Sequence, residues 1–216
     1  LNVFETLEDY YDFDRTDKHK YCYGRVQNPT VRILEDKIAA LEHGVGALAF
    51  ASGMAAATTA VLTACKAGSH VVCLHNAYGP LKDFLSKYCT EHLDITRTYV
   101  TGDRVEEFEE AVTDATDLIV LESPSSVLFS LQDIRAVSRI ARKHQALVYI
   151  DNTFCTPIYQ QPLDMGADIE LPTTSKHIGG HRDILGGMLA VMYKELSKTL
   201  TANRELLGGT IAHMVA

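Results

Sequence analysis

The sequence lacks the features that would place the chain in a membrane or on a nucleic acid. It contains no run of about 18 apolar residues, so it predicts no membrane-spanning helix. No basic block offsets the formal net charge of −8, which argues against a nucleic-acid partner. A hydrophobic fraction of 46% is typical of a globular domain. We therefore expect neither a membrane nor a nucleic acid among the partners.

Cysteine pairs with metal-ligand spacing are also absent. No Cys-x-x-Cys occurs among the cysteines, which are Cys22, Cys65, Cys73, Cys89 and Cys155. This favours buried free thiols in a reducing cytoplasm over disulfides or a zinc cluster. Leu1 is not an initiator methionine, and the first residues lack a basic-then-apolar signal pattern. We expect the chain to begin inside a longer protein located in the cytoplasm.

The usual nucleotide and metal motifs are missing as well. There is no Gly-x-Gly-x-x-Gly and no Gly-x-x-x-x-Gly-Lys-Ser/Thr, so dinucleotide and triphosphate sites lack sequence support. His177 and His181 are four residues apart, but the intervening Gly179-Gly180 disfavours the helix that a metal-binding pair needs. No glutamate follows the first histidine, so we predict no metal site.

Apolar runs that suit strands alternate with stretches of helical periodicity. We expect strands at residues 47–50, 70–74, 95–100, 118–121, 147–150 and 188–192, and helices at 31–41, from about 53, at 80–88, at 134–141 and from about 194. Such an alternation predicts an α/β fold with a mostly parallel sheet covered by helices on both faces. Residues 1–30 have no clear period, and we predict an irregular N-terminal arm that a neighbouring surface orders, followed by a large domain at 31–216.

Small and polar residues follow several of the expected strands, and in such sheets ligands bind beyond the carboxyl ends of the strands. Ser52 opens a helix whose first N–H groups, at Gly53 and Met54, can bind a phosphate. Tyr78 can stack on a cofactor ring, and Asp151 can pair with a cationic ring nitrogen. Taken singly, the same residues also fit helix caps and a packed tyrosine.

Lys176 is the most informative residue of the chain. Three hydroxyl residues, Thr173 to Ser175, precede it, and Gly179-Gly180 follows. The hydroxyls can hold a phosphate, the glycines let the backbone turn close to a ring, and a buried lysine amine readily becomes nucleophilic. These are the requirements for a Schiff base with a phosphate-bearing aldehyde. A lone lysine of this kind also fits a polar surface loop. Other motifs elsewhere in the chain favour a lysine that binds a cofactor.

The other motifs of the chain occur in a fixed order that ends at Lys176. They are Tyr23-Gly24-Arg25-x-x-Asn28-Pro29-Thr30, Ser52-Gly53-Met54, Ala77-Tyr78-Gly79, Glu122-Ser123-Pro124, Asp151-Asn152-Thr153 and Thr173-Thr174-Ser175-Lys176. With them the sequence resembles the pyridoxal-phosphate enzymes of cysteine and methionine metabolism: cystathionine β- and γ-lyases, cystathionine γ-synthase and methionine γ-lyase. The resemblance implies a fold-type-I, aminotransferase-like large domain after an N-terminal arm. It also implies a homodimer at least, expected as a homotetramer.

The resemblance assigns a role to each motif residue. Lys176 would form the Schiff base with pyridoxal 5'-phosphate and then shuttle protons, with Tyr78 stacked on the ring and assisting as acid or base. Asp151 would keep the pyridine nitrogen protonated, so that the ring acts as an electron sink. Tyr23 and Arg25 would reach the phosphate of a neighbouring subunit's cofactor. The remaining cofactor-binding residues would be Ser52, Gly53, Met54, Ser126, Thr173 and Ser175.

Departures from the family pattern bear on the reaction. Most members have Asn-Pro after the Glu-Ser/Thr-Pro-x motif, with the Asn near the cofactor's phenolic oxygen, where this chain has Ser126-Val127. The run from Gly79 to Lys87 stands where γ-lyases commonly have Gly-Gly-Thr. Both features resemble bacterial cystathionine β-lyases, whereas Asn28-Pro29-Thr30 is the pattern of γ-lyases and synthases. The chain ends at Ala216, and we expect it to lack the smaller C-terminal domain whose arginine binds the substrate α-carboxylate.

The implied function is that of a pyridoxal-phosphate-dependent carbon–sulfur lyase. It would act on a sulfur amino acid such as cystathionine or cysteine, by Schiff-base formation, Cα deprotonation and β-elimination. Within the family the alternative is γ-elimination or γ-replacement. Outside it, the alternative is an inactive or truncated homologue that only binds the cofactor, which Ser126 and the missing C-terminal part favour.

Overall fold

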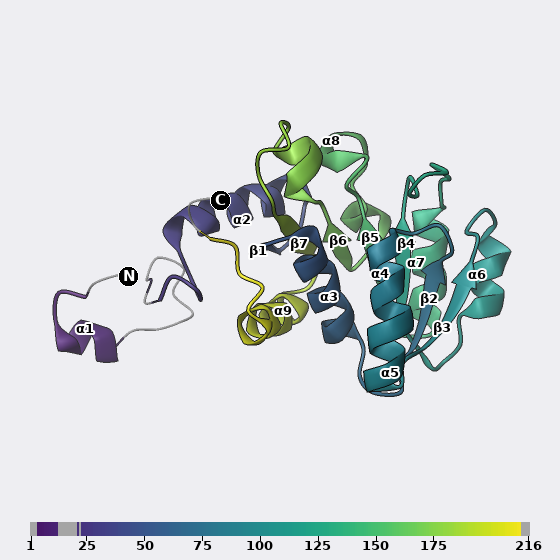
Figure 1. The fold of residues 1–216 in the computed structure, drawn as a ribbon, viewed down its shortest axis with the longest axis horizontal. Coiled ribbons are helices and arrows are strands. Elements are labelled where there is room, and N and C mark those ends of the chain that lie inside the picture. Colours follow the sequence, from purple (N-terminus) through teal and green to yellow (C-terminus); the bar gives the residue numbers. More distant parts are fainter. Residues whose placement is uncertain (1–3, 13–20, 22, 213–216) are drawn as a thin grey trace.

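The sheet is built from short strands of mainly apolar residues. The computed structural model describes residues 4–12, 21 and 23–212, and within them the strands form a seven-stranded sheet (Figure 1). The strands are β1 (Gly46–Phe50), β2 (His70–Leu74), β3 (Thr96–Val100), β4 (Thr116–Glu122), β5 (Leu147–Asp151), β6 (Ile169–Leu171) and β7 (Gly187–Val191). Their order across the sheet is β1-β7-β6-β5-β4-β2-β3.

Most neighbouring strands run parallel, as the sequence predicts. The pairs β3–β2, β2–β4, β4–β5 and β5–β6 are parallel, whereas β7 runs antiparallel to both β6 and β1. The carboxyl ends of β2, β4, β5 and β6 therefore meet at one edge of the sheet. That edge is the expected place for a ligand in an open α/β sheet.

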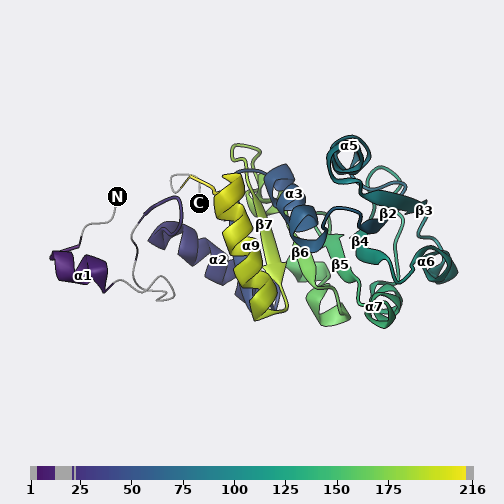
Figure 2. The same cartoon turned by 90° about the horizontal axis from the view of Figure 1, so that it is seen from below.

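Helices cover both faces of this sheet. Figure 2 shows α3 and α5 on one side and α7 on the other. The helices are α1 (Leu7–Tyr11), α2 (Pro29–Leu41), α3 (Gly53–Ala64), α4 (Gly79–Asp83), α5 (Thr90–Leu93), α6 (Val105–Ala111), α7 (Ile134–Lys143), α8 (Thr156–Tyr159) and α9 (Lys194–Leu207). Two π-helical segments (Phe84–Cys89 and Thr174–Ile178) and a 3₁₀ turn (Leu163–Met165) complete them. None of the helices in the described part of the chain has the length and apolar character needed to span a bilayer.

Polar side chains set the starts of the main helices. Asn28 accepts the N–H of Thr30 before α2, Ser52 accepts that of Ala55 before α3, and Asp133 accepts that of Ala136 before α7. Each bond satisfies one of the N–H groups that have no partner inside the helix. The helices therefore begin close to the positions that the sequence predicts.

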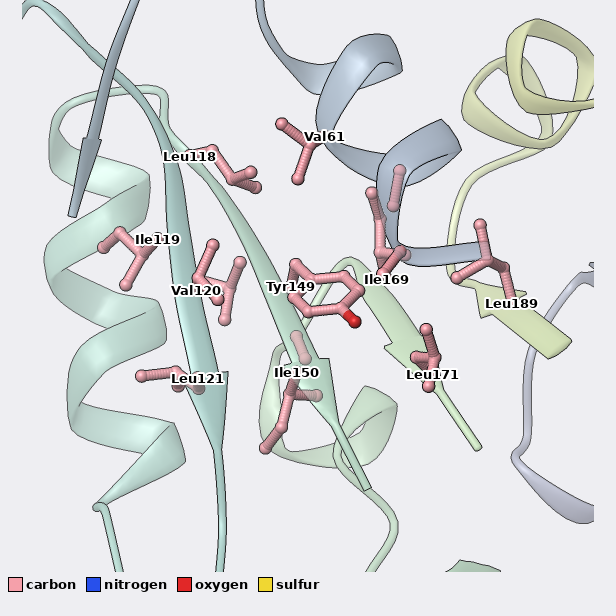
Figure 3. Close-up of a cluster of buried hydrophobic side chains, with 14 of the residues drawn as sticks. Val61, Leu118, Ile119, Val120, Leu121, Tyr149, Ile150, Ile169, Leu171 and Leu189 are labelled. Carbon is pink, nitrogen blue, oxygen red and sulfur yellow. The ribbon is translucent and has the colours of Figure 1, made fainter. Parts of the chain in front are cut away.

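The core lies between the sheet and its helices. Leu118 to Leu121 of β4 are all buried, as are Tyr149 and Ile150 of β5, so these central strands are covered on both faces (Figure 3). Strands in this environment have apolar residues at successive positions instead of an alternating pattern. That is why short continuous apolar runs located them correctly.

Several elements were not expected from the sequence, among them α8, the 3₁₀ turn at Leu163–Met165 and the π-helical segment Thr174–Ile178. β6 is three residues long with Glu170 at its centre, so it has no continuous apolar run. α6 is rich in glutamate and buries only Phe108 fully among its residues. α1 lies within the arm predicted to be irregular, where Thr6 and Asp9 bond reciprocally in a capping box. The helix expected at 80–88 begins at Gly79 and continues through the π-helical segment and α5 to Leu93.

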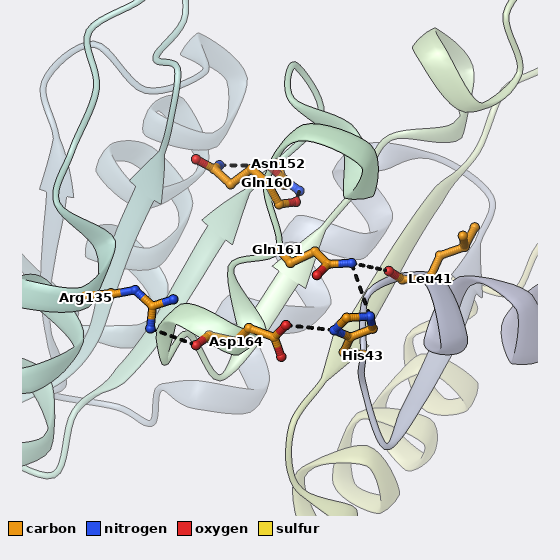
Figure 4. A network of polar contacts seen from close by, with 7 residues as sticks. All are labelled: Leu41, His43, Arg135, Asn152, Gln160, Gln161 and Asp164. Atoms are coloured by element: carbon orange, nitrogen blue, oxygen red, sulfur yellow. Dashed lines mark hydrogen bonds and ion pairs between the residues drawn. The ribbon is translucent and has the colours of Figure 1, made fainter.

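A polar network ties the segment after β5 to α2 and α7 (Figure 4). His43 Nδ1 lies 2.7 Å from Asp164 Oδ2, and Gln161 donates to the Leu41 carbonyl at 3.1 Å. Arg135 donates to the Asp164 carbonyl at 3.0 Å. The chain that leaves Asp151 is thereby held against two helices, which restrains the carboxyl end of β5.

Candidate active site

A cavity of about 260 Å³ opens at the carboxyl ends of β4, β5 and β6. It is lined by Ser52, Gly53, Met54, Ala57, Tyr78, Leu81, Glu122, Tyr149, Asp151, Thr153, Leu171, Thr173, Ser175, Lys176 and Leu185. Most residues that the sequence predicted for the site are in this set. Those that are not are Tyr23, Arg25 and Ser126.

The start of α3 forms one wall. Ser52 caps the helix through the N–H of Ala55 at 3.0 Å, which leaves the helix start facing the cavity with Gly53 and Met54. A Cβ at Gly53 would lie 2.8 Å from the Thr173 hydroxyl oxygen, so only glycine lets the helix approach this threonine so closely. A helix N-terminus beside a hydroxyl is a suitable place for a phosphate.

The three hydroxyl residues before Lys176 differ in their surroundings. Thr173 lines the cavity, and its N–H donates to the Thr153 hydroxyl at 3.0 Å. Thr174 is buried and does not line it. Ser175 lines the cavity, but its hydroxyl donates to the Gly186 carbonyl at 3.2 Å and accepts the Gly186 N–H at 3.0 Å. Of the three, Thr173 is the one best placed for a phosphate.

Lys176 projects over two aromatic rings. Its Nζ lies 5.9 Å from the centroid of Tyr78 and 5.4 Å from that of Phe154. Its backbone angles, φ −114° and ψ −114°, interrupt the π-helical turn.

One expectation about the surroundings of Lys176 was wrong. We expected a buried amine, but the side chain is exposed, because no described residue covers the open side of the cavity. The close approach of the glycines to a ring stays a prediction, and neither glycine lines the cavity. Gly179 instead packs beneath Ile184, where a Cβ would lie 2.7 Å from that side chain. The glycines therefore shape the turn that follows the lysine.

Asp151 ends β5 and faces the cavity. Its Oδ1 accepts the N–H of Thr153 at 2.9 Å. Burial raises the pKa of the Asp151 carboxyl, while its hydrogen bonds with Thr153 and the charge of Lys176 lower it. A cation placed in the cavity would therefore be favourable for this carboxylate.

Glu122, which the sequence analysis did not assign to the site, also lines the cavity. It is 3% exposed, and its Oε2 accepts the Tyr78 N–H at 2.6 Å. Burial raises the pKa of its carboxyl to about 7, the Ser126 hydroxyl lowers it and the charge of Asp151 raises it. The signal in the sequence was an acid placed directly after a buried apolar strand.

Ser126 and the arm residues lie outside the cavity. The Ser126 hydroxyl donates to Glu122 Oε1 at 2.6 Å, and its contact with a cofactor stays a prediction. Arg25 donates to the Glu205 carbonyl at 3.2 Å, and its guanidinium lies 5.2 Å from the Tyr23 ring. The contact of Tyr23 and Arg25 with a neighbouring subunit's cofactor stays a prediction.

Tyr149 lies beneath the cavity with an unsatisfied hydroxyl. It is 1% exposed, and its Oη has no hydrogen-bond partner among the described residues (Figure 3). Burial raises the pKa of this phenol well above its usual value, and the charges of Asp151 and Glu122 act in the same direction. A buried polar group without a partner is costly, which suits a site that a ligand completes.

The cysteines and histidines take no part in the cavity. The four cysteines in the described part of the chain, Cys65, Cys73, Cys89 and Cys155, are free thiols, and Cys22 lies outside it. Cys73 and Cys89 are buried as expected, whereas Cys65 and Cys155 are half-buried. Among the described residues no group of three or more histidine, cysteine or acidic side chains could hold a metal ion.

The fold and the cavity together define a class. A mostly parallel α/β sheet that brings a lysine, an aspartate and a helix start to its carboxyl edge is the arrangement of fold-type-I cofactor enzymes. A family model described as Cys/Met metabolism PLP-dependent enzyme matches residues 3–216. The chain belongs to this family of pyridoxal-phosphate-dependent enzymes of cysteine and methionine metabolism.

Individual relatives differ in the reaction that their names state. The chain is 39% identical over 191 residues to cystathionine gamma-lyase of Bacillus subtilis (strain 168). This alignment covers 88% of this chain and 50% of that protein. It is 41% identical over 181 residues to cystathionine beta-lyase MetC of Staphylococcus haemolyticus (strain JCSC1435), covering 84% and 46%. The chain thus spans about half the length of the curated relatives it matches.

Solved structures agree with the fold. The crystal structure of metB from Corynebacterium glutamicum superposes with a TM-score of 0.88 at 33% identity, covering 94% of this chain and 54% of that one. Cystathionine gamma synthase from Xanthomonas oryzae pv. oryzae superposes with a TM-score of 0.87 at 31% identity, covering 93% and 52%. The predicted α/β, fold-type-I architecture is confirmed.

Proposed function

We propose that this chain forms the cofactor-binding part of a carbon–sulfur lyase that acts on a sulfur amino acid such as cystathionine or cysteine by β-elimination. The observation that supports the proposal is the arrangement of Lys176, Tyr78 and Asp151 around one cavity with the start of α3 in its wall. The run after Tyr78 and the serine at position 126, which resemble the β-lyase branch, favour β-elimination.

The residues of the cavity fit pyridoxal 5'-phosphate. The start of α3 at Gly53 and Met54, with the Thr173 hydroxyl beside it, would hold the phosphate. Asp151 would face the ring nitrogen and keep its proton in place. The Tyr149 hydroxyl, which has no partner in the described part of the chain, adds a polar group that a bound molecule can satisfy. Ser52 contributes indirectly, because it caps the helix that presents these N–H groups.

When bound, the cofactor supplies an electron sink for the charge that develops as the substrate Cα loses its proton. Lys176 would hold the cofactor through its amine, and the same amine, when free, would take that proton. Tyr78 presents its ring beside this amine, with centroid and Nζ 5.9 Å apart, and its hydroxyl can give a proton to the departing sulfur. Elimination at Cγ needs a second proton transfer, from Cβ, which the same lysine can perform.

A second candidate is γ-elimination or γ-replacement. It is favoured by Asn28-Pro29-Thr30 and by relatives whose names are cystathionine gamma-lyase and probable cystathionine gamma-synthase. We also propose a homodimer at least, expected as a homotetramer, in which Tyr23 and Arg25 reach a neighbour's site. Light scattering of the purified protein measures that assembly.

A product assay separates these candidates. The natural full-length protein that contains this chain would be loaded with pyridoxal phosphate and given cystathionine, cysteine or methionine. We expect pyruvate, whereas 2-oxobutyrate would favour γ-elimination. Absence of both keto acids would contradict lyase activity and favour γ-replacement or a homologue that only binds the cofactor.

The role of Lys176 has its own test. Lys176→Ala should lose the visible absorbance band of the bound cofactor and the borohydride-stable mass adduct. Lys198→Ala is the matched control, because Lys198 is exposed and pairs with Glu195 on α9, outside the cavity. A stable adduct in the Lys176 variant would contradict the assignment.

A further inference from the structure

Glu122 connects two loops at the cavity wall. Its Oε2 accepts the backbone N–H of Tyr78, and its Oε1 accepts the hydroxyl of Ser126, both at 2.6 Å. Tyr78 belongs to the loop after β2, and Ser126 to the loop after β4. Glu122 is 3% exposed, and the low exposure of its carboxylate strengthens the hydrogen bonds that it accepts.

The N–H of Tyr78 requires an acceptor from elsewhere in the fold. Tyr78 is the N-cap of α4, and its own side chain makes no cap bond. In a capping box, a glutamate or glutamine at the third helical position accepts the N–H of the cap residue. Here that position is Leu81, which has no acceptor in its side chain. Glu122 takes this place from the end of β4.

A second contact joins the same two loops. Asn76 Nδ2 donates to the Ser125 hydroxyl at 2.8 Å and to the Ser130 hydroxyl at 2.9 Å. The two serine hydroxyls also lie 2.9 Å apart, and the Ser125 N–H donates to the Ser130 carbonyl at 3.0 Å. The loop after β2 is thus attached to a closed loop after β4 at residues 76 and 78. The place of the Tyr78 ring beside Lys176 follows from this attachment.

We propose that Glu122 is the positioning residue of Tyr78, and that Ser126 orients the Glu122 carboxylate instead of contacting the cofactor. The inference rests on the proposed function, in which Tyr78 stacks on the cofactor ring. It gives a physical reason for the departure at position 126. A serine hydroxyl reaches back to Glu122 and completes the connection between the loops.

The connection does not depend on the charge of Glu122. The ionisable groups around it are Asp151 and Tyr149 on β5, Lys176 after β6, and Cys73 on β2. Burial raises the pKa of the Glu122 carboxyl to about 7, so both protonation states occur near neutral pH. A protonated carboxyl keeps a carbonyl oxygen that accepts the Tyr78 N–H. A glutamine has the same acceptor, and its amide can donate to Ser126.

Hydrogen exchange of the Tyr78 amide tests this directly. It would be followed by mass spectrometry with residue-level fragmentation, on the natural full-length protein without cofactor. Glu122→Ala should speed exchange of that amide about tenfold, because its acceptor is lost. Glu122→Gln should leave the exchange rate of that amide unchanged. Glu109→Ala, at an exposed glutamate of α6, is the matched control and should leave it unchanged.

A spectroscopic readout follows on the loaded protein. Visible circular dichroism of the bound cofactor should change in Glu122→Ala and be restored in Glu122→Gln, because only the first displaces the stacked ring. Ser126→Ala should speed exchange of the Tyr78 amide about threefold, because the Glu122 carboxylate loses the hydroxyl that orients it. This variant is the test if Glu122→Ala does not fold. A wild-type exchange rate in Ser126→Ala would then overturn the proposal.

Two further results would overturn it: wild-type Tyr78 exchange in a folded Glu122→Ala, or equally fast exchange in Glu122→Gln and Glu122→Ala. Because the exchange experiment uses cofactor-free protein, it stands apart from the product assay. If the product assay contradicted the lyase proposal, the Tyr78 exchange rates could still be interpreted. If the exchange rates contradicted the positioning role of Glu122, the protein could still form keto acids.

Discussion

Glu122 and Asp151 are in-register neighbours at the carboxyl ends of β4 and β5. Burial raises the pKa of both carboxyls, yet their partners differ. Both Glu122 oxygens accept hydrogen bonds from residues of two different loops, Tyr78 and Ser126, whereas Asp151 bonds with Thr153, two residues further along the chain. Two acids with unequal surroundings can take unequal roles. Asp151 is the one available to a cation in the cavity.

Replacing Asp151 by Asn should therefore separate cofactor attachment from turnover. The amide keeps the size of the side chain but cannot hold a protonated ring nitrogen, so kcat should fall about 100-fold or more. The borohydride-stable adduct on Lys176 should persist. Steady-state kinetics and mass spectrometry measure the two effects. Wild-type kcat in Asp151→Asn would contradict the pairing of this carboxylate with the ring.

Replacing Tyr149 by Phe removes the hydroxyl that has no partner among the described residues. The cofactor-free protein should become more stable by about 1 kcal/mol, because an unsatisfied buried group is removed. If the cofactor satisfies this hydroxyl, the gain should vanish in the loaded protein. Denaturant unfolding with and without pyridoxal phosphate measures the difference. A loss of stability in the cofactor-free variant would show that the hydroxyl has a partner.

A buried ion pair connects α2 and α9 to β1 through hydrogen bonds. Arg204 Nη1 and Glu35 Oε1 lie 2.5 Å apart, and they bond to the carbonyl and N–H of Ala49 at 3.1 and 3.0 Å. Removing one partner leaves an unpaired buried charge, so Arg204→Met should destabilise the fold by about 3–5 kcal/mol.

Adding Glu35→Leu to Arg204→Met should recover much of that loss, because no charge then remains buried. Free energies of unfolding for the wild type, both single variants and the double variant complete the cycle. Additive losses in the double variant would mean that the two side chains stabilise the fold independently.

The carboxyls of Glu42 and Glu170 are fully buried, and Asn152 donates to Glu170 Oε1 at 2.6 Å, whereas Glu170 Oε2 and both Glu42 oxygens have no hydrogen-bond partner among the described residues. Burial raises the pKa of both carboxyls above the ordinary value of 4.5, and the neighbouring Glu42 carboxyl raises the pKa of Glu170 further. The folded protein therefore keeps a proton that the unfolded chain releases. This contribution is full below about pH 4.5 and is lost as pH rises through the folded-state pKa.

Glu170→Gln should flatten this dependence, because its amide does not titrate. The free energy of unfolding should fall less steeply above about pH 5 than in the wild type. Glu122, Asp151 and Asp168 shift in the same direction, so the difference between variant and wild type is the quantity to measure. An unchanged pH slope in Glu170→Gln, with Glu109→Gln as control, would contradict the raised pKa of Glu170.

Many strands and helix starts could be predicted from the sequence, because they depend on residues that are neighbours along the chain. Leu118 to Leu121 form a continuous apolar run, and Ser52 and Asn28 cap helices that start directly after them. β6 could not be found in this way, since Glu170 interrupts it and its stability comes from its neighbours β5 and β7. The same holds for Lys176, whose exposure depends on what lies above the cavity and not on its own flanking residues.

By itself the sequence determined the family, the α/β architecture and the motifs that meet at the carboxyl edge of the sheet. These follow from short-range patterns and from the order of motifs along the chain. Only the tertiary structure decided that Ser126 turns to Glu122, that Glu122 accepts the Tyr78 N–H and that the Tyr149 hydroxyl has no hydrogen-bond partner among the described residues. Contacts of this kind join residues of separate strands and loops, and packing of the whole sheet fixes them.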